Sequence, residues 1–273
     1  MTDSAVSPHT GEKAGGDVIV EMRSGVLWII INREARRNAL NARVVEAMAD
    51  AVAASEKMPG CRAIVITGAG EKAFCAGADL QKNVEGFAFS VDFSDPTHYL
   101  VDLFKKMQNC RLPIIARVNG HVMAGGFGLL CACDMAIASE DVLLGTPEAK
   151  IGLIPMMILP WMMRIVPERK LLEMCITGEP LTAKEGLELG IVNYVTARAE
   201  LDEKVQWLLA RITDKSPTAV RLGKQAFRAM RDMTMEQALE YAQVMVPSMA
   251  STQDAREGLA AFRDKRAPSW SGK

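Results

Sequence analysis

The sequence predicts an α/β fold, with a core of repeated β–α units followed by a helical region. Short runs rich in β-branched residues alternate with segments of helical periodicity over residues 18–200. Residues 201–273 carry the patterns of four helices with long apolar faces. Repeated β–α units imply parallel strands joined by right-handed crossovers. The chain has 273 residues, of which 49% are hydrophobic, and this is enough for a sizeable core.

The first elements are a tail, a hairpin and a helix. Residues 1–17 are small and polar and lack an apolar run, so we expect a flexible tail that is not a secretory signal. Two β-rich runs, at 18–22 and 26–32, are separated by a three-residue turn, which is typical of a hairpin. Asn38 or Asn41 can cap the helix that follows.

Beyond this helix, strands and helices alternate before the chain becomes mainly helical. Residues 72–80 are too rich in small side chains to predict either a helix or a strand. Residues 81–96 are expected to form a mobile, lid-like loop, and residues 147–152 a turn. The remaining strands are expected at 62–67, 112–118, 134–139, 142–145 and 191–195, and the remaining helices at 97–109, 125–133, 159–166, 168–177, 183–189, 201–215, 219–231, 235–246 and 252–263.

Composition excludes several functional classes. The net charge is −1 with both signs mixed along the chain, so we expect no nucleic-acid partner and no membrane partner. The longest uncharged apolar stretches are too short to span a bilayer. Six cysteines without C-x-x-C spacing and only three histidines argue against a metal site. The cysteines are those of a reduced core, which indicates a cytoplasmic protein.

Gly125 and Gly126 stand at the start of an uncharged helical run. Two adjacent glycines let another molecule approach the backbone, because no Cβ intervenes. The first N–H groups of a helix lack partners and carry partial positive charge, so such an end can hold an oxygen that becomes anionic during a reaction. The alternative is a glycine pair that only lets a buried helix pack against a strand.

Four segments carry a resemblance to a known family. They are short, but they come in the family's order with its spacing. The segments are Ile31-Asn32-Arg33 with Asn38-Ala39-Leu40-Asn41, the run 73–80, the run 119–126 with Cys133-Asp134, and Thr146-Pro147-Glu148 with 151–155. Together they resemble the crotonase (enoyl-CoA hydratase/isomerase) superfamily, and the resemblance covers residues 18–270.

The resemblance implies a crotonase-like spiral of ββα units with a C-terminal helical trimerisation region. The implied organisation is a tail at 1–17, a spiral core at 18–200 and a helical region at 201–273, assembled as a homotrimer or a hexamer. The implied substrate is an acyl-CoA thioester, and no cofactor is expected because CoA is part of the substrate. By position, the backbone N–H groups of Ala78 and Gly125 would stabilise the thioester enolate.

Residues around the same motifs would bind CoA. The resemblance assigns this role to Arg36, Ala39, Ala76, Asp79, Leu80, Gly126 and Pro147. Arg36 and its neighbour Arg37 can also meet CoA phosphates through charge-assisted hydrogen bonds. The alternative for these two arginines is a solvated turn before the helix.

One carboxylate of the family's usual pair is missing. Hydratases of this family use two glutamates, of which one corresponds to Glu148 and the other falls on Gly128 in this sequence. A single base beside an enolate suits transfer of a proton from C2 to C4, so double-bond isomerisation is expected, with Glu148 as acid and base. The alternatives are a weak or atypical hydratase and a non-catalytic CoA-binding scaffold.

Other residues invite different interpretations. The run 68–73 fits a G-x-G-x-x-A dinucleotide fingerprint, but a helix would have to start there. Cys75 is a candidate nucleophile, although an apolar setting would raise the pKa of its thiol. His121 can orient a ligand or simply pack. Trp161 and a methionine cluster can line an acyl pocket or belong to the core, the methionines being Met156, Met157, Met162 and Met163.

Overall fold

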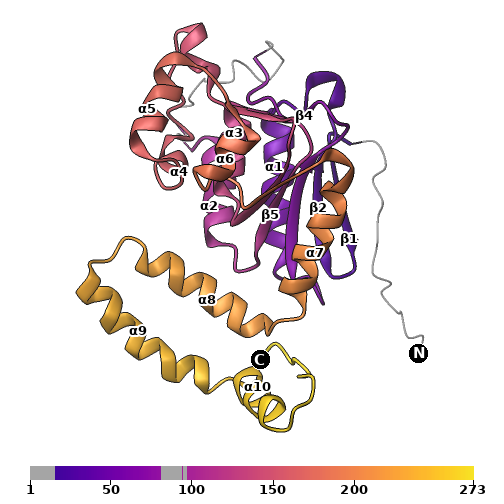
Figure 1. Cartoon of the computed structure of the whole chain (residues 1–273), viewed down its shortest axis with the longest axis vertical. Coiled ribbons are helices and arrows are strands. Elements are labelled where there is room, and N and C mark those ends of the chain that lie inside the picture. Colours follow the sequence, from indigo (N-terminus) through magenta and orange to yellow (C-terminus); the bar gives the residue numbers. More distant parts are fainter. Residues whose placement is uncertain (1–15, 81–93, 95–96) are drawn as a thin grey trace.

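Two β-sheets and the helices around them form the body of the molecule, and the last helices leave it as an arm (Figure 1). The computed structural model describes residues 16–80, 94 and 97–273. The rest of the predicted tail and of the predicted lid-like loop lies outside these residues. Among the described residues, no helix is both long enough and apolar enough to cross a bilayer.

The larger sheet begins with the predicted hairpin and continues with parallel strands. Its order is β1 (Val18–Arg23), β2 (Val26–Ile31), β3 (Ala63–Gly68), β5 (Ile114–Val118), β7 (Met135–Ser139) and β10 (Tyr194–Thr196). Only β1 and β2 pair antiparallel in this sheet. The parallel pairing confirms the α/β class that the repeated β–α units predict.

Strand β2 shows how one sequence pattern builds both layers of the core. Its residues alternate between two faces, as strand residues must. Leu27, Ile29 and Ile31 are buried in a cluster with α1 and α2. Val26 and Trp28 are buried on the opposite face, in a cluster with α7. A strand covered on both faces needs this nearly continuous apolar run.

A smaller sheet lies beside the first and carries the segments of greatest functional interest. Its order is β4 (Ala73–Cys75), β6 (His121–Met123), β8 (Leu143–Gly145) and β9 (Leu181–Thr182). β4, β6 and β8 run parallel, whereas β9 pairs antiparallel with β8. We did not predict β4, β6 or β9, because two or three residues are too few to show a periodicity.

The helices of the body lie close to their expected positions. Asn41 caps the first, and its side chain accepts a hydrogen bond from the Val44 N–H at 3.0 Å. The bounds are η1 (Glu34–Arg36), α1 (Ala42–Ser55), α2 (Tyr99–Asn109), α3 (Gly125–Ala132), η2 (Pro147–Ile151), α4 (Leu159–Met162), α5 (Glu168–Thr177), α6 (Ala183–Glu188), η3 (Arg198–Glu200) and α7 (Leu201–Thr213).

Three predicted elements have clearly different bounds in the structure, and one of them, the helix expected at 235–246, extends to Ala250. The helix expected at 159–166 ends at Met162, and Pro167 disfavours helical geometry in the residue before it. The strand expected at 191–195 is shifted to Tyr194–Thr196. Ile191 and Val192 are buried in the core without belonging to a strand, so their apolar character reports packing and not extended structure.

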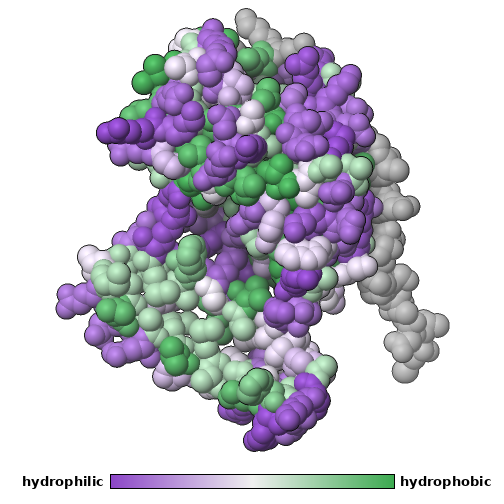
Figure 2. Space-filling view, in the orientation of Figure 1, coloured by the Kyte–Doolittle hydropathy of each residue, from purple (hydrophilic) through white to green (hydrophobic). Residues whose placement is uncertain are grey.

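The arm consists of α8 (Pro217–Met230), α9 (Met235–Ala250) and α10 (Gln253–Arg263). Polar contacts attach it to the body, since Lys224 and Arg228 of α8 both reach Asp134, at 2.5 and 2.9 Å. Its large hydrophobic side chains are mostly exposed (Figure 2). The exposed residues are Phe227, Met235, Leu239, Val244, Val246, Leu259 and Phe262.

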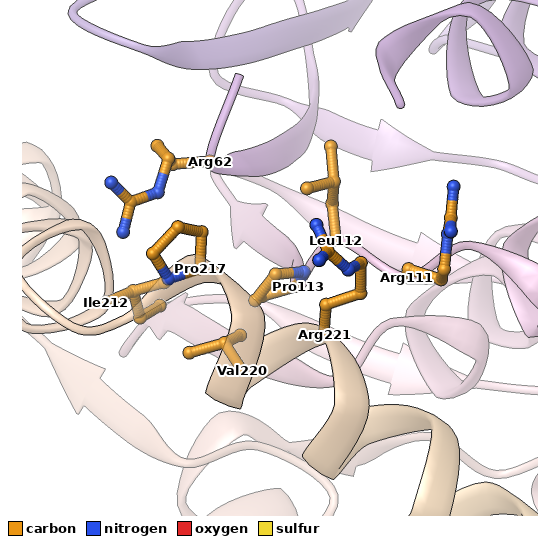
Figure 3. A pocket seen from close by; sticks show the side chains of 8 residues that line it. All are labelled: Arg62, Arg111, Leu112, Pro113, Ile212, Pro217, Val220 and Arg221. Atoms are coloured by element: carbon orange, nitrogen blue, oxygen red, sulfur yellow. The ribbon is translucent and has the colours of Figure 1, made fainter. Parts of the chain in front are cut away.

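A small pocket lies at the base of the arm, where α8 begins (Figure 3). Its volume is about 10 Å³, which is about the space of one water molecule, so it offers no room for a substrate. The lining residues are Arg62, Arg111, Leu112, Pro113, Ile212, Pro217, Val220 and Arg221.

Candidate active site

Three neighbouring parallel strands end at one edge of the small sheet, and each leads into one predicted catalytic residue. Ala78 follows the end of β4, Gly125 follows the end of β6, and Glu148 follows the end of β8. Ligands of parallel sheets bind beyond the carboxyl ends of the strands, because the connecting loops gather there. The sheet order therefore places the three segments that carry these residues next to one another.

The loops after β4 and β6 are in direct contact. A Cβ added to Gly77 would lie 3.1 Å from the Gly125 nitrogen and 2.5 Å from the Ala124 Cβ. A Cβ added to Gly125 would lie 3.7 Å from the Ala78 nitrogen. Gly77 also has φ +92°, a conformation that other residues rarely adopt. Glycine is thus required where the two predicted donors approach each other.

The N–H of Ala78 is directed away from the strand-like segment beside it. Leu40 and Ala78 form an isolated parallel bridge. In this bridge the Leu40 N–H donates to the Gly77 carbonyl and the Leu40 carbonyl accepts from the Asp79 N–H, both at 2.7 Å. Such a bridge leaves the Ala78 N–H on the opposite side. Within the described part of the chain it donates to no backbone carbonyl, so a ligand oxygen can bind there.

The second donor opens helix α3. Ala124, before the helix, has φ 52° and ψ −124°, and it supplies no side-chain cap. Its own N–H donates to the Gly145 carbonyl at 2.9 Å, which ties the helix start to β8. The Gly125 N–H has no backbone acceptor among the described residues. As the first amide of a helix, it adds the positive end of the helix dipole to the site.

Glu148 combines burial with the lack of a partner. It lies in η2, half-buried, and its Oε2 atom is fully buried with no hydrogen-bond partner in the described structure. Burial raises the pKa of the carboxyl above its usual value, and a hydrogen bond from the residue's own backbone only partly opposes this. A carboxylate with a raised pKa is a better proton acceptor, so Glu148 has the properties of a general base.

A polar framework that we did not predict holds the first and second motifs together. The Arg33 guanidinium donates to Asp79 at 2.8 Å and to the Ala39 carbonyl at 2.6 Å. Asn38 is fully buried, with φ 56°, and its amide donates to the Ala73 carbonyl at 2.7 Å. Asn38 itself was the sequence signal for this turn. Asparagine adopts left-handed backbone more easily than most residues, and the motif around it contains no glycine.

The residues predicted to bind CoA are distributed over this framework. The Asp79 carboxylate is engaged by Arg33, which gives it a role in fixing the loop. Ala39 is buried, Ala76 is half-buried, and the Ala76 N–H donates to the Arg37 carbonyl at 3.0 Å.

The other predicted CoA contacts differ in exposure. Arg36 is exposed in η1, Leu80 is 49% exposed, and Pro147 is half-buried. Gly126 is buried so tightly that a Cβ there would lie 2.3 Å from the Cys75 carbonyl oxygen. The CoA-binding role of all these residues stays a prediction.

Two alternative interpretations of single motifs lose support, and His121 is not packed in the core. Cys75 is fully buried, and burial raises the pKa of its thiol to about 12, so it is not a nucleophile at neutral pH. The run 68–73 connects β3 to β4 without a helix, so the dinucleotide fingerprint is a coincidence. His121 is exposed, and its Nδ1 accepts from the Leu143 N–H at 3.0 Å.

The methionine cluster does not form one wall. Met162 is fully buried in the core, whereas Met156 and Met163 are each 67% exposed. Trp161 packs edge-on against Phe104 with ring centroids 6.3 Å apart. The cluster therefore belongs partly to the core and partly to the surface.

Comparison with known proteins identifies the family. Residues 21–273 match the family model described as enoyl-CoA hydratase/isomerase. The carnitinyl-CoA dehydratase of Salmonella typhi is 35% identical over 261 residues, covering 92% of this chain and 97% of that one. The carnitinyl-CoA dehydratase of Proteus mirabilis is 34% identical over 260 residues, with the same coverage of both chains.

Solved structures share the fold over nearly the whole chain. The enoyl-CoA hydratase of Mycobacterium smegmatis superposes with a TM-score of 0.86 at 28% identity, covering 93% of this chain and 99% of that one. The enoyl-CoA hydratase of Bacillus anthracis gives 0.84 at 30% identity, covering 94% and 100%. The four sequence motifs, the crotonase-like fold and the family match agree, and the chain belongs to the enoyl-CoA hydratase/isomerase family.

Proposed function

We propose that this chain moves a proton on an acyl-CoA thioester whose carbonyl oxygen is held by the N–H groups of Ala78 and Gly125. The observation that carries the proposal is the shared edge of β4, β6 and β8, from which these two amides and Glu148 all emerge. Two amides aimed at one oxygen stabilise the negative charge of an enolate. Removing one such donor typically costs ~10²–10³ in rate.

The reaction that this arrangement favours is double-bond isomerisation of a 3-enoyl-CoA to a 2-enoyl-CoA. Glu148 takes a proton from C2, and the electron pair moves onto the thioester oxygen as a dienolate. Glu148 then returns the proton to C4, and the double bond shifts to C2–C3. One base suffices for both transfers, which fits Gly128 at the position of the family's other glutamate.

Dehydration is the second candidate, because the relatives at 34–35% identity are named carnitinyl-CoA dehydratase. Glu148 would take the C2 proton of a 3-hydroxyacyl-CoA and give it to the departing hydroxyl, which leaves as water. The reverse reaction is hydration of a 2-enoyl-CoA. Without a second carboxylate at position 128, we expect this activity to be weak, since a general acid or base typically contributes 10²–10⁴-fold.

A thioester panel tests the proposal. Wild type, Glu148→Gln and the control Glu188→Gln are assayed with 3-enoyl-, 2-enoyl- and 3-hydroxyacyl-CoA. Glu188 lies exposed on α6, so its variant should keep full activity. We expect 3-enoyl-CoA to react fastest and Glu148→Gln to lose about 10²–10⁴-fold of the turnover.

The panel also separates the alternatives. Faster turnover of 3-hydroxyacyl-CoA would make the protein a dehydratase, and full activity in Glu148→Gln would assign the base to another residue. No turnover of any thioester by a wild type that binds CoA would make the protein a scaffold. Titration with CoA of variants at the predicted contacts tests the binding role of each. These contacts are Arg36, Ala39, Ala76, Asp79, Leu80, Gly126 and Pro147.

We also propose a homotrimer or a hexamer in the cytoplasm. The exposed apolar side chains of the arm support assembly, because large exposed apolar patches mark interfaces. Leu259 and Phe262 on α10 are 70% and 86% exposed and share one helix face. Light scattering should give a multiple of three chains for wild type and smaller species for Phe262→Ser, whereas a monomeric wild type would contradict assembly. Six unpaired cysteines support a reducing compartment.

A further inference from the structure

Helix α3 packs against the start of α4 at a position where it has no side chain. A Cβ added to Gly128 would lie 2.1 Å from the Ile158 Cγ2 and 2.4 Å from the Ile158 Cβ. It would also lie 3.3 Å from the Phe104 ring. No real Cβ contact is this short, so the space beside Gly128 is already occupied by the branched part of Ile158.

Ile158 has little freedom to yield this space. It is 2% exposed, and one of its two overlapping atoms is the Cβ, whose position follows from the backbone. That backbone is fixed on both sides, since the Ile158 N–H donates to the Pro155 carbonyl at 3.2 Å. The Ile158 carbonyl accepts from the N–H groups of Trp161 and Met162, both at 3.1 Å.

The occupied space adjoins the proposed reaction centre. Gly125 and Gly128 are three residues apart on α3, so both face the same side of the helix. Ile158 thus covers the turn next to the amide that would hold the thioester oxygen. Phe104 and the edge-on ring of Trp161 continue the same surface, and none of these side chains binds a proton.

We propose that Ile158 is a specificity-determining residue, which keeps position 128 a glycine and thereby excludes a second carboxylate and the water that it would hold. A dienolate formed beside this surface takes back a proton from Glu148, and a 2-enoyl-CoA bound there meets no water activated for addition to C3. Ile158 therefore selects proton transfer over water addition. This inference rests on the proposed function for the placement of the thioester.

A double-mutant cycle tests the inference. The variants are Gly128→Glu, Ile158→Ala and the two combined, each measured for the melting temperature without substrate and for hydration of a 2-enoyl-CoA. Gly128→Glu alone should melt several degrees lower and gain no hydration, because its side chain overlaps Ile158. The combined variant should melt higher than Gly128→Glu and hydrate about 10²-fold faster than wild type.

A second glycine provides a matched control. Gly223 lies inside α8, and no atom lies within 4 Å of the position of an added Cβ. Gly223→Ala should raise the melting temperature slightly, since alanine favours a helix more than glycine does, whereas Gly128→Ala should lower it. Equal shifts in these two variants would show that Ile158 does not restrict position 128.

A separate result would contradict the claim that Ile158 selects proton transfer over hydration. A folded combined variant that still isomerises 3-enoyl-CoA but hydrates no faster than wild type would overturn the role of Ile158. That result would leave the proposed function intact, because the proposed function is tested separately by the activity of Glu148→Gln. The melting measurements need no substrate, so they decide the packing claim even if the thioester panel rejects isomerisation.

Discussion

The polar groups at the edge of the small sheet lack partners, whereas those that join the arm to the body are fully paired. At the sheet edge, Glu148 Oε2 is buried without a hydrogen-bond partner, and the Ala78 and Gly125 amides have no backbone acceptor in the described chain. At the base of the arm, Asp134 accepts from Lys224, from Arg228 and from a backbone N–H. Leaving buried polar groups unpaired costs free energy, so an unpaired set indicates a ligand and a paired set indicates structure.

The largest effect should come from breaking the paired set. Asp134→Asn removes the counter-ion that contacts Lys224, whose side chain is only 10% exposed. Burial already lowers the pKa of Lys224, and Asp134 is the nearest group that opposes this. Removing a hydrogen-bond partner of a buried charged group typically costs about 3 kcal/mol, and we expect a loss of this size in the free energy of unfolding measured with urea at neutral pH.

An exposed ion pair gives the control for this variant. Asp232 pairs with Arg164 at 3.0 Å, and its side chain is 65% exposed. Asp232→Asn should leave the free energy of unfolding almost unchanged, because water screens the pair. If both variants lost the same amount, the arm would not depend on burial of Lys224.

A smaller effect is expected within the arm. Asp254 is 1% exposed, and although burial raises its pKa, hydrogen bonds from Ser216 and from the N–H groups of Ser271 and Gly272 lower it to about 2. Its contribution is present above the ordinary Asp pKa of about 4 and is lost as pH falls through about 2. Asp254→Asn should therefore cost roughly 2 kcal/mol at neutral pH.

The pH dependence checks this assignment. Thermal unfolding of wild type and Asp254→Asn should differ at pH 7 and converge near the low end of that window. A difference that stayed constant down to acid pH would mean that the charge of Asp254 is irrelevant to its role.

The smallest effect has the opposite sign and concerns the unpaired set. The raised pKa of Glu148 means that its ionised form is disfavoured in the folded state. The protein is therefore most stable below the ordinary Glu pKa, and it loses this stability as pH rises through the raised pKa. Glu148→Gln should raise the melting temperature by a few degrees at neutral pH while it lowers turnover by about 10²–10⁴-fold. Lower stability of Glu148→Gln at pH 7 would instead assign Glu148 a structural partner.

Local sequence patterns predicted many of the helices and strands, but they did not reveal the contacts between residues far apart in the chain. The alternation in β2 and the cap at Asn41 are visible in consecutive residues, and both are confirmed. The resemblance located the active-site candidates, but it could not show what fills the space at position 128. The pair of Gly128 and Ile158 and the pair of Arg33 and Asp79 join residues 30 and 46 positions apart, and no periodicity connects such residues.

The short strands of the small sheet were missed for a related reason. β4 and β6 have three residues each, and their stability comes from neighbours in the sheet and not from their own composition. α7 was predicted correctly as a helix, yet only the structure shows that Leu201 and Val205 pack it on the large sheet. The division of the chain at residue 200 stays a prediction.

The contact between Gly128 and Ile158 also restricts the order in which a chain like this can change its chemistry through single mutations. A larger residue at 128 while Ile158 is present creates an overlap, so that intermediate is selected against before any new activity appears. A smaller residue at 158 only leaves a cavity, which a protein with some stability in reserve tolerates. The favoured order of substitutions is therefore a smaller residue at position 158 first and a larger residue at position 128 second.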